Sequence, residues 1–245
     1  MGGMVGNNSC GSTSIEYGST RDHTLAVKAI LSDGSDVEFS PLSKEEFNSK
    51  TQGTSLEADL YKHMYSELDN PMIRDHIKSG YPKASITRRN TGYAVDALME
   101  TNVFTESNDA FNFSKLLCGS EGTLAFTTEL KLKIVPLPKP FQVVLNAHFN
   151  SITESLQATL VAMKQSPSAC ELMDKTILDC TKDNITQQKN RFFVKGDPEA
   201  ILMVEFRGDT LEEAKQQAKA LETILKTSQL GYAYKLVEGE DCDKV

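Results

Sequence analysis

Alternating apolar and polar positions predict strands in the first half of the chain. Residues 25–31 form a mostly apolar run, followed by an Asp33-Gly34 turn signal and a second run at 37–39, so a β-hairpin is expected there. Residues 123–135 are predicted to form a strand. Its residues 130–134 alternate leucine or isoleucine with lysine, which is the pattern of a half-buried strand. Residues 111–118 are predicted to form one further strand.

Helices are predicted where a capping residue precedes an apolar stripe of helical period. Capping-box patterns begin at Ser43 and at Thr54, and leucine or methionine recurs every four residues after the second of them. Asn70-Pro71 opens another helix, which Gly80 ends. One more short helix is predicted over residues 92–100, whereas the glycine-rich first 20 residues are expected to form a loop packed against the rest.

The proline-rich stretch 136–140 predicts a stiff linker, which divides the chain into a domain at 1–138 and a domain at 139–245. Beyond it, a strand, a helix and a strand are followed by the same order again. That order is typical of a ferredoxin-like sandwich, with helices on one face of an antiparallel sheet. The first of these helices, capped by Ser151, has one apolar face made of Ile152, Leu156, Leu160 and Met163.

Composition narrows the classes of function. The chain has 245 residues, 39% of them hydrophobic and 24% charged, which is an ordinary balance for a globular protein. A net charge of -8 without any basic stretch argues against nucleic-acid binding. There is no apolar run of about 18 residues, so no transmembrane helix is expected. The five widely spaced cysteines favour free thiols in a reducing cytoplasm over disulfides or a metal site.

Two glycine-rich segments are the main candidates for chemistry. The first runs from Gly2 to Gly11 and continues to Tyr17-Gly18, and the second runs from Cys118 to Leu124. Glycine lets the backbone approach a ligand and reach positive φ, and successive N–H groups can form anion-binding concavities. Neither segment has the spacing of a Rossmann fingerprint or a P-loop. From the glycine pattern alone, a plain loop remains the alternative.

The order and spacing of these segments resemble the FAD domain of the vanillyl-alcohol oxidase/p-cresol methylhydroxylase type. Residues 2–11, 17–23 and 31–34 look like the middle of that domain, and residues 117–126 look like its closing segment. Other segments are similar to the branch of D-lactate, glycolate and 2-hydroxyglutarate dehydrogenases and to the opening of its substrate domain; these are residues 77–82, 92–98, 171–174 and 204–208.

The resemblance implies an α+β fold. Its first part would be the second lobe of a PCMH-type FAD-binding domain, mainly antiparallel sheet with helices, and its second part a ferredoxin-like portion of an FAD-linked oxidase C-terminal domain. It also implies FAD as cofactor, hydride transfer from a small D-2-hydroxy acid to the flavin, and a further electron acceptor. The residues implied to contact the flavin are Gly2, Gly3, Gly6, Asn7, Asn8, Ser9, Gly11, Tyr17, Gly18, Gly119, Glu121, Gly122, Thr123 and Leu124.

Two parts of the family pattern have no counterpart here, namely the N-terminal FAD lobe and the segments that close the substrate domain. The catalytic residues are therefore expected outside the chain, which by itself should retain FAD weakly and be inactive. The alternatives are a non-catalytic binding or scaffold module that keeps the flavin-domain sheet without cofactor, and the cell-wall UDP-sugar reductase branch. An unpaired sheet edge would favour association into a homo-oligomer.

Five further residues are weighed as single candidates. His23 could contact the flavin, and the pair Arg88-Arg89 could meet the FAD phosphates or an acidic substrate. Arg191 and Lys195 could face a carboxylate substrate. The alternatives are a strand-start residue for His23 and solvated side chains for the basic residues. No metal ligand and no catalytic residue is assigned.

Overall fold

The computed structural model describes residues 1–83, 85–86 and 88–245, and the chain divides into two compact units. Unit 1 comprises Met1–Gly11 and Gly18–Val135, and unit 2 comprises Ser12–Tyr17 and Pro136–Val245. The predicted α+β class is confirmed, since each unit combines helices with an antiparallel sheet. The domain limits at residue 138 remain a proposal, because a short N-terminal segment groups with unit 2.

Unit 1 is built on a three-stranded antiparallel sheet in the order β2-β1-β3. Strand β1 (Thr24–Ile30) pairs with β2 (Asp36–Phe39), which confirms the predicted hairpin, and on its other side with β3 (Phe126–Leu132). The turn signal has a clear basis, because Asp33 accepts two hydrogen bonds from Ser35 and the following glycine has a φ of +85°.

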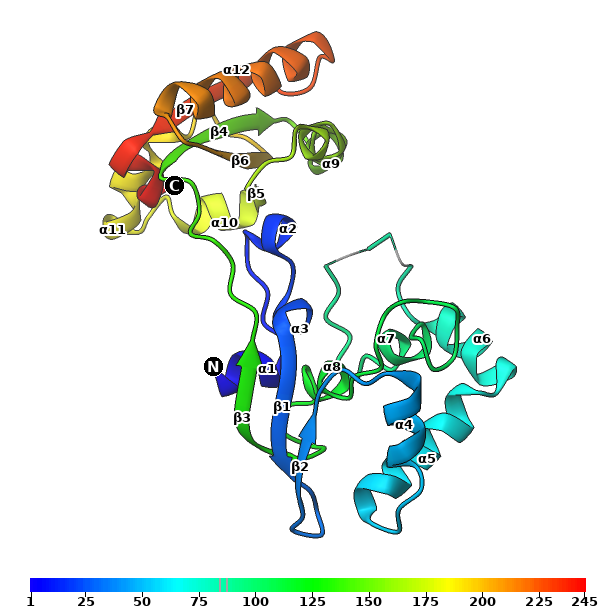
Figure 1. Ribbon diagram of the computed structural model, residues 1–245. Helices are drawn as coiled ribbons and strands as arrows, with labels where there is room; N and C mark the ends of the chain where they lie inside the picture. Colours follow the sequence, from blue (N-terminus) through cyan, green and yellow to red (C-terminus); the bar gives the residue numbers. More distant parts are fainter. Residues whose placement is uncertain (84, 87) are drawn as a thin grey trace. The chain divides into compact units, whose positions relative to one another are not determined.

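Five helices gather beside this sheet, and Figure 1 shows them to one side of β1 and β2. The predicted capping box at Ser43 is confirmed, because its hydroxyl accepts from the Glu46 amide while the Glu46 carboxylate accepts from the Ser43 amide. The second cap lies one residue later than predicted, at Ser55. The helices are α4 (Lys44–Lys50), α5 (Leu56–Leu68), α6 (Pro71–Gly80), α7 (Asp96–Met99) and α8 (Ser114–Leu117).

An aromatic cluster joins α4 and α5 to the sheet, where the ring of Phe113 lies 5.4 Å from that of Phe39 in β2. The ring centroid of Phe111 lies 4.7 Å from that of Phe47 and 4.9 Å from that of Phe113, and Tyr61 lies 4.8 Å from Phe113. All five side chains are buried. Edge-to-face and tilted contacts of this kind stabilise a core beyond the burial of their area, so the packing of α4 and α5 depends on this cluster.

The strand predicted over residues 111–118 is wrong. Asn112 accepts a hydrogen bond from the Ser114 amide and donates one to the carbonyl of Leu25, so its side chain turns the backbone into α8. Side-chain bonds to nearby backbone groups compete with strand formation in this way. Only an isolated bridge between Phe111 and Leu42 remains of the predicted strand.

The N-terminal segment is also more ordered than the loop that its glycines predict. It forms α1 (Gly2–Gly6), α2 (Ser14–Tyr17) and α3 (Thr20–His23). Val5 supplies the reason for α1, because its side chain is buried and its amide bonds to the carbonyl of Met1 at 3.1 Å. One buried apolar side chain thus outweighs the low helix propensity of glycine.

Unit 2 has a four-stranded antiparallel sheet in the order β5-β6-β4-β7, which is the predicted ferredoxin-like topology. Figure 1 shows α9 and α12 on one face of this sheet, with α10 and α11 on the other. The strands are β4 (Phe141–Phe149), β5 (Ala169–Asp174), β6 (Ala200–Gly208) and β7 (Ala233–Glu238). The helices are α9 (Ile152–Ala162), α10 (Lys175–Cys180), α11 (Ile185–Gln188) and α12 (Leu211–Thr227), with 3₁₀ turns η1 (Met163–Gln165), η2 (Lys189–Phe193) and η3 (Gly239–Lys244).

The two covering helices use their faces differently. Helix α12 buries its predicted apolar stripe, including Leu221 and Leu225, in the core. Helix α9 instead turns its small residues to the core and exposes its large ones, so that Leu160 is 70% exposed while Ala158 and Ala162 are fully buried. The small face lets α9 approach β6 and α12 closely, whereas the stripe from Ile152 to Met163 faces outwards.

We therefore expect Leu160→Gln to lower the free energy of unfolding by less than about 0.5 kcal/mol, because the side chain is already in water. Leu221→Ala should cost about 2 to 5 kcal/mol, because it leaves a cavity in the core. Urea unfolding followed by circular dichroism measures both. A larger loss for the α9 variant would contradict this orientation of the helix.

Strand β4 carries a fully buried histidine, His148. Its Nε2 atom accepts a hydrogen bond from the Lys195 amide at 3.0 Å, and its Nδ1 atom lies 3.2 Å from the carbonyl of Ala233. The ring is therefore neutral, with its proton on Nδ1. Burial lowers the pKa of His148 from its ordinary value of 6.5, which opposes protonation.

This burial predicts an acid sensitivity of unit 2. The unfolded chain takes up the proton near pH 6.5 and the folded protein only at lower pH, so the stabilisation is complete above pH 6.5 and is lost as the pH falls below it. In chemical unfolding between pH 5 and 7.5, the free energy of unfolding of the parent chain should fall as the pH falls. The fall should be smaller in His148→Gln. It should be unchanged in His63→Gln, which alters an exposed histidine. If the free energy of unfolding of His148→Gln depends on pH as strongly as that of the parent chain, another group causes the acid sensitivity.

Candidate functional site

The two glycine-rich segments lie side by side in unit 1. The amide of Gly119 donates to the carbonyl of Val5, and the amide of Glu121 donates to the carbonyl of Gly6, both at 2.9 Å. A Cβ added to Gly6 would lie 4.0 Å from the Cα of Glu121, so the two backbones are in contact. Segments more than 100 residues apart in the sequence therefore form one surface.

Tight turns with positive φ shape both segments. Asn8 has a φ of +52° and Glu121 one of +54°, while Gly119 and Gly122 reach +96° and +73°. Asparagine tolerates this conformation better than most residues, and glycine adopts it without strain. Such turns direct backbone groups outwards and allow them to bind an anion or a ring oxygen.

Gly119 is confined by its neighbours as well as by its φ. An added Cβ would lie 2.5 Å from Nη2 of Arg21 and 2.8 Å from the carbonyl oxygen of Gly92. Gly122 has no atom within 4 Å of such a Cβ, and it lies at the exposed end of the loop. The second segment therefore has a packed base at Gly119 and an open tip at Gly122.

The two glycine segments, residues 2–11 and 118–124, meet at a place that we call the junction. Arg21 fills the base of this junction. Its guanidinium donates to the carbonyls of Gly92, Lys115 and Cys118 at 2.7 to 3.2 Å. Burial lowers the pKa of Arg21, but an arginine retains its charge even so. Burial likewise raises the pKa of the Cys118 thiol, which is therefore neutral and serves as a small packed side chain.

Asn8 is fully buried between the two segments. Its Oδ1 atom accepts from the amide of Arg21 at 2.7 Å and from the thiol of Cys118 at 3.6 Å. Within residues 1–83, 85–86 and 88–245, no acceptor pairs with its Nδ2 atom. A buried donor without a partner is unfavourable in a folded chain, so Asn8 marks the junction as a place where a further group could bind.

Hydroxyl groups and apolar side chains line the open side of the second segment. The hydroxyls of Tyr93 and Thr123 are 2.5 Å apart, and Thr123 donates to the carbonyl of Ser120. Leu124 and Phe126 are exposed by 42% and 71%. Polar main-chain groups thus lie beside exposed apolar surface, a combination that suits a flat ring with a polar edge.

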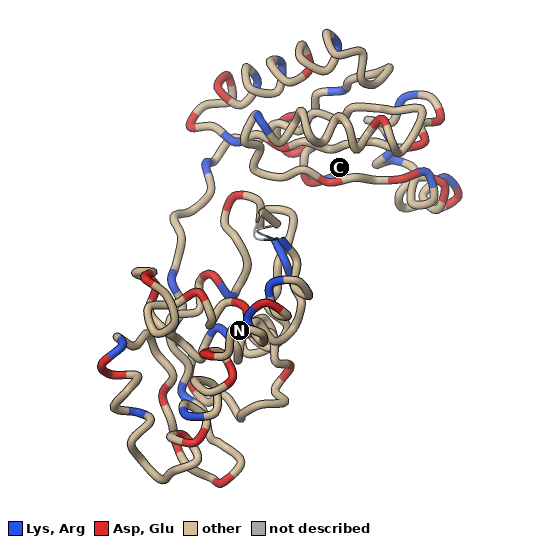
Figure 2. The backbone as a smooth tube through the Cα atoms, turned by 90° about the vertical axis from the view of Figure 1, so that its right-hand side faces the viewer, with Lys and Arg blue, Asp and Glu red and all other residues tan. Residues whose placement is uncertain are grey.

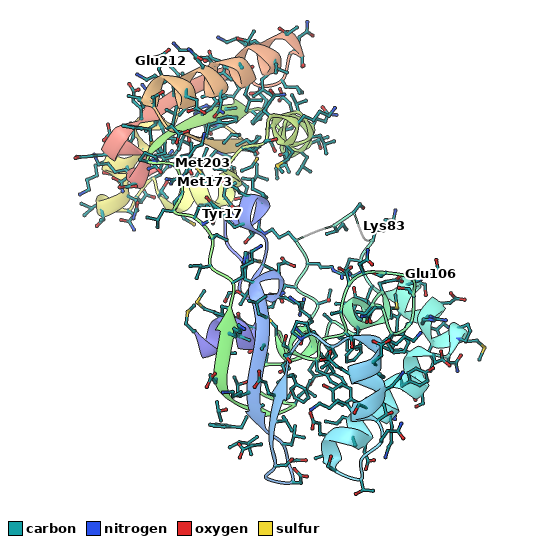
Figure 3. The ribbon with its side chains drawn as sticks, viewed as in Figure 1. Tyr17, Lys83, Glu106, Met173, Met203 and Glu212 are labelled. Atoms are coloured by element: carbon teal, nitrogen blue, oxygen red, sulfur yellow. The ribbon has the colours of Figure 1, made fainter. Side chains whose placement is uncertain are left out.

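All of the predicted site residues except Tyr17 belong to unit 1. Tyr17 lies on α2, which groups with unit 2 and packs against β5; Figure 3 shows Tyr17 beside Met173 of that strand. The exposed candidates in unit 1 are Gly2, Gly3, Asn7, Gly11, Gly18, Glu121, Gly122, Thr123 and Leu124. Gly6 and Ser9 are half-buried, and Asn8 and Gly119 are buried. A role in ligand binding stays a prediction for all of them.

Two of the single candidates, Arg89 and Arg191, have partners within the protein. Arg89 pairs with the buried carboxylate of Asp96, and Arg191 donates to Leu178 and Thr181. Their ligand roles therefore have no support in this geometry. Sequence reasoning missed Arg21 as a structural centre, although a basic residue just before an apolar strand and just after a glycine segment was a visible signal.

Gly119→Ala should lower the free energy of unfolding of unit 1 by about 3 kcal/mol or more, because it adds overpacking to a strained φ. Gly122→Ala is the matched control, since it carries the φ strain without a clash and should cost about 1 kcal/mol. Thermal and urea unfolding measure the difference. Equal costs for the two variants would mean that the packing at the base of the loop is not tight.

Comparison with known proteins supplies independent findings. Residues 138–237 match the family described as FAD linked oxidases, C-terminal domain. The chain is 28% identical over 250 residues to a D-2-hydroxyglutarate dehydrogenase of Pantoea ananatis, covering 98% of this chain and 24% of that protein. It is also 28% identical over 225 residues to a D-2-hydroxyglutarate dehydrogenase of Escherichia coli, covering 90% and 21%. The chain thus spans about a quarter of the length of these relatives.

Among solved structures, an alkyldihydroxyacetonephosphate synthase is similar with a TM-score of 0.50 and 13% identity, over 96% of this chain and 34% of that one. At this identity the likeness concerns the fold alone. Figure 2 shows basic residues interspersed with acidic ones along both units. In the part of the chain that the structure describes, no helix is long and apolar enough to cross a membrane.

Proposed function

We propose that the chain, whose residues 138–237 match the FAD linked oxidases, C-terminal domain, serves the FAD-dependent oxidation of a small D-2-hydroxy acid. The proposal that FAD is the cofactor is supported by the bonding of the Gly119 and Glu121 amides to the first glycine segment, which brings the two segments together. The hydroxy-acid part is supported by relatives named D-2-hydroxyglutarate dehydrogenase. Because the chain spans about a quarter of those proteins, the activity is proposed for the whole protein.

The residues of the junction fit the proposed cofactor. FAD combines an anionic pyrophosphate with a wide aromatic ring, so its site needs main-chain donors next to apolar surface. Main-chain amides at the exposed tip of the second segment, those of Gly122 and Leu124, would supply the donors, because the amides of Gly119 and Glu121 already bond to the first segment. Leu124 and Phe126 would supply apolar surface for the ring, and Tyr93 with Thr123 would bond to its polar edge. Gly122 has no side chain and no neighbouring atom within 4 Å of an added Cβ, so a ligand could approach the backbone closely there.

The two domains would have separate roles. Residues 1–138 would form part of the FAD-binding domain, and residues 139–245 part of the substrate domain. When bound, FAD supplies the hydride acceptor of the reaction. The protein would orient it and hold the substrate, whose electrons would leave to a further acceptor. No residue of this chain is assigned a catalytic role.

One observation favours a second function, the non-catalytic binding or scaffold module. The two glycine segments are joined by their own hydrogen bonds, and the buried Arg21 uses main-chain carbonyls as partners. A junction that is held together internally does not require a cofactor to fold. Measured affinity for FAD separates the two functions.

We expect the chain to bind added FAD weakly and reversibly, with a Kd above about 10 μM, because the two glycine segments offer few contacts to a ligand of this size. Quenching of flavin fluorescence during titration measures it. Leu124→Asp should weaken binding at least about tenfold by placing a carboxylate beside the site. Leu137→Asp is the matched control, because Leu137 is 94% exposed in the linker and should change nothing.

Three outcomes would contradict this expectation. A stoichiometric yellow complex that survives gel filtration would show that the chain retains FAD by itself. Absence of binding at millimolar FAD would refute the proposal that this chain binds FAD and would favour the scaffold module. Equal weakening by the Leu124 and Leu137 variants would place the flavin elsewhere.

A further inference from the structure

Arg21 is a buried arginine whose hydrogen bonds go to main-chain carbonyls of separate segments. Nη2 donates to Gly92 and to Cys118, each at 2.7 Å, and Nε donates to Lys115 at 3.0 Å and to Cys118 at 3.2 Å. Only 7% of the residue is exposed. One side chain therefore ties the end of α8 to the loop that precedes α7.

The main chain of Arg21 extends this connection to the first glycine segment. Its amide donates to Oδ1 of Asn8 at 2.7 Å, and its carbonyl accepts from Nζ of Lys115 at 2.8 Å. Lys115 also donates to the carbonyl of Thr24 at 2.9 Å. The backbone of Arg21 thus holds Asn8 while its side chain holds the residue before Gly119.

The second glycine segment is held at its other end as well. Tyr93, the neighbour of Gly92, lies within hydrogen-bond distance of Thr123, and the hydroxyl of Tyr81 donates to the carbonyl of Tyr93 at 2.6 Å. Arg21 fixes Gly92 and Cys118 together, so it sets both the start of the segment and the loop that contacts its end.

A planar guanidinium is well suited to this task. It donates in fixed directions to several carbonyls at once, whereas the single ammonium of a lysine does not span the same fork. Within the described residues, no carboxylate lies within ion-pair distance of Arg21 or Lys115, so carbonyl oxygens alone satisfy the two charges.

We propose that Arg21 is a positioning residue, which holds the loop from Gly119 to Leu124 against the segment from Gly2 to Gly11 before any ligand binds. It acts through Asn8, Gly92 and Cys118 and has no cofactor contact of its own. The value of this arrangement for FAD binding rests on the proposed function, but the arrangement of the loops does not. Holding donors in place beforehand strengthens binding by lowering the ordering cost.

The test compares Arg21→Lys and Arg21→Met with Arg74→Lys in the whole chain without ligand. Arg74 belongs to the same unit and donates to a single carbonyl, that of Phe104, at 3.3 Å. Amide hydrogen exchange is measured at Gly119 and Glu121 and, for reference, along β1. Both Arg21 variants should speed exchange at the two loop amides at least about tenfold, with β1 unchanged, since bonds to a charged donor are lost. The Arg74 variant should have no effect.

A second measurement follows FAD affinity, which should fall about tenfold in Arg21→Lys and stay constant in Arg74→Lys. Unchanged amide exchange at Gly119 and Glu121 in Arg21→Lys would overturn the proposal. It would show that a lysine ammonium holds the loop as well as the guanidinium of Arg21 does. Equal acceleration along β1 would overturn it too, because Arg21 would then support the whole unit. If the parent chain binds no FAD, the proposed function fails, and the exchange result still decides the role of Arg21.

Discussion

The pairing of two loop backbones is the interaction on which the candidate site depends. The amides of Gly119 and Glu121 bond to the carbonyls of Val5 and Gly6 in the first glycine segment. Backbone groups that leave solvent need partners, and glycine-rich segments have few side chains to offer. The two loops therefore satisfy each other, and the surface that they share follows from this requirement.

Glycine at the base of the junction and arginine above it depend on one another. The guanidinium of Arg21 passes where a side chain of residue 119 would lie, so the close bonding of Arg21 to Cys118 and Gly92 requires a glycine there. The buried charge in turn needs carbonyl oxygens, and a sharp turn exposes them. Local strain and long-range bonding are thus combined at one point, which is common where a fold supports a ligand.

Fold and function rest on different observations in this protein. The antiparallel sheets, the ferredoxin-like order of unit 2 and the matched family concern the architecture, which many proteins share without a common activity. A function has to come from a site, and the candidate site proposed here combines main-chain groups of two loops, the buried Asn8 amide and the exposed apolar side chains of Leu124 and Phe126. These features suit FAD, whereas the hydroxy acid is supported by the relatives alone.

Local patterns determined much of the secondary structure, and the predicted α+β class and flavoprotein resemblance are confirmed. The hairpin at Asp33-Gly34, the capping box at Ser43 and the strands of unit 2 need only neighbouring residues to be recognised. The strand predicted at 111–118 failed because the Asn112 side chain bonds to the nearby Ser114 amide and to the distant Leu25 carbonyl, and periodicity reveals neither bond.

Tertiary structure alone decided which faces and which residues meet. It turned the large side chains of α9, such as Leu160, to the outside, because small residues allow the helix to approach the sheet. It also joined Asn8, Arg21 and Cys118, which lie up to 110 residues apart. The chain by itself specifies turns, caps and periodicity, since these act over a few residues. Contacts between distant segments depend on how the whole core packs, and no local pattern contains that information.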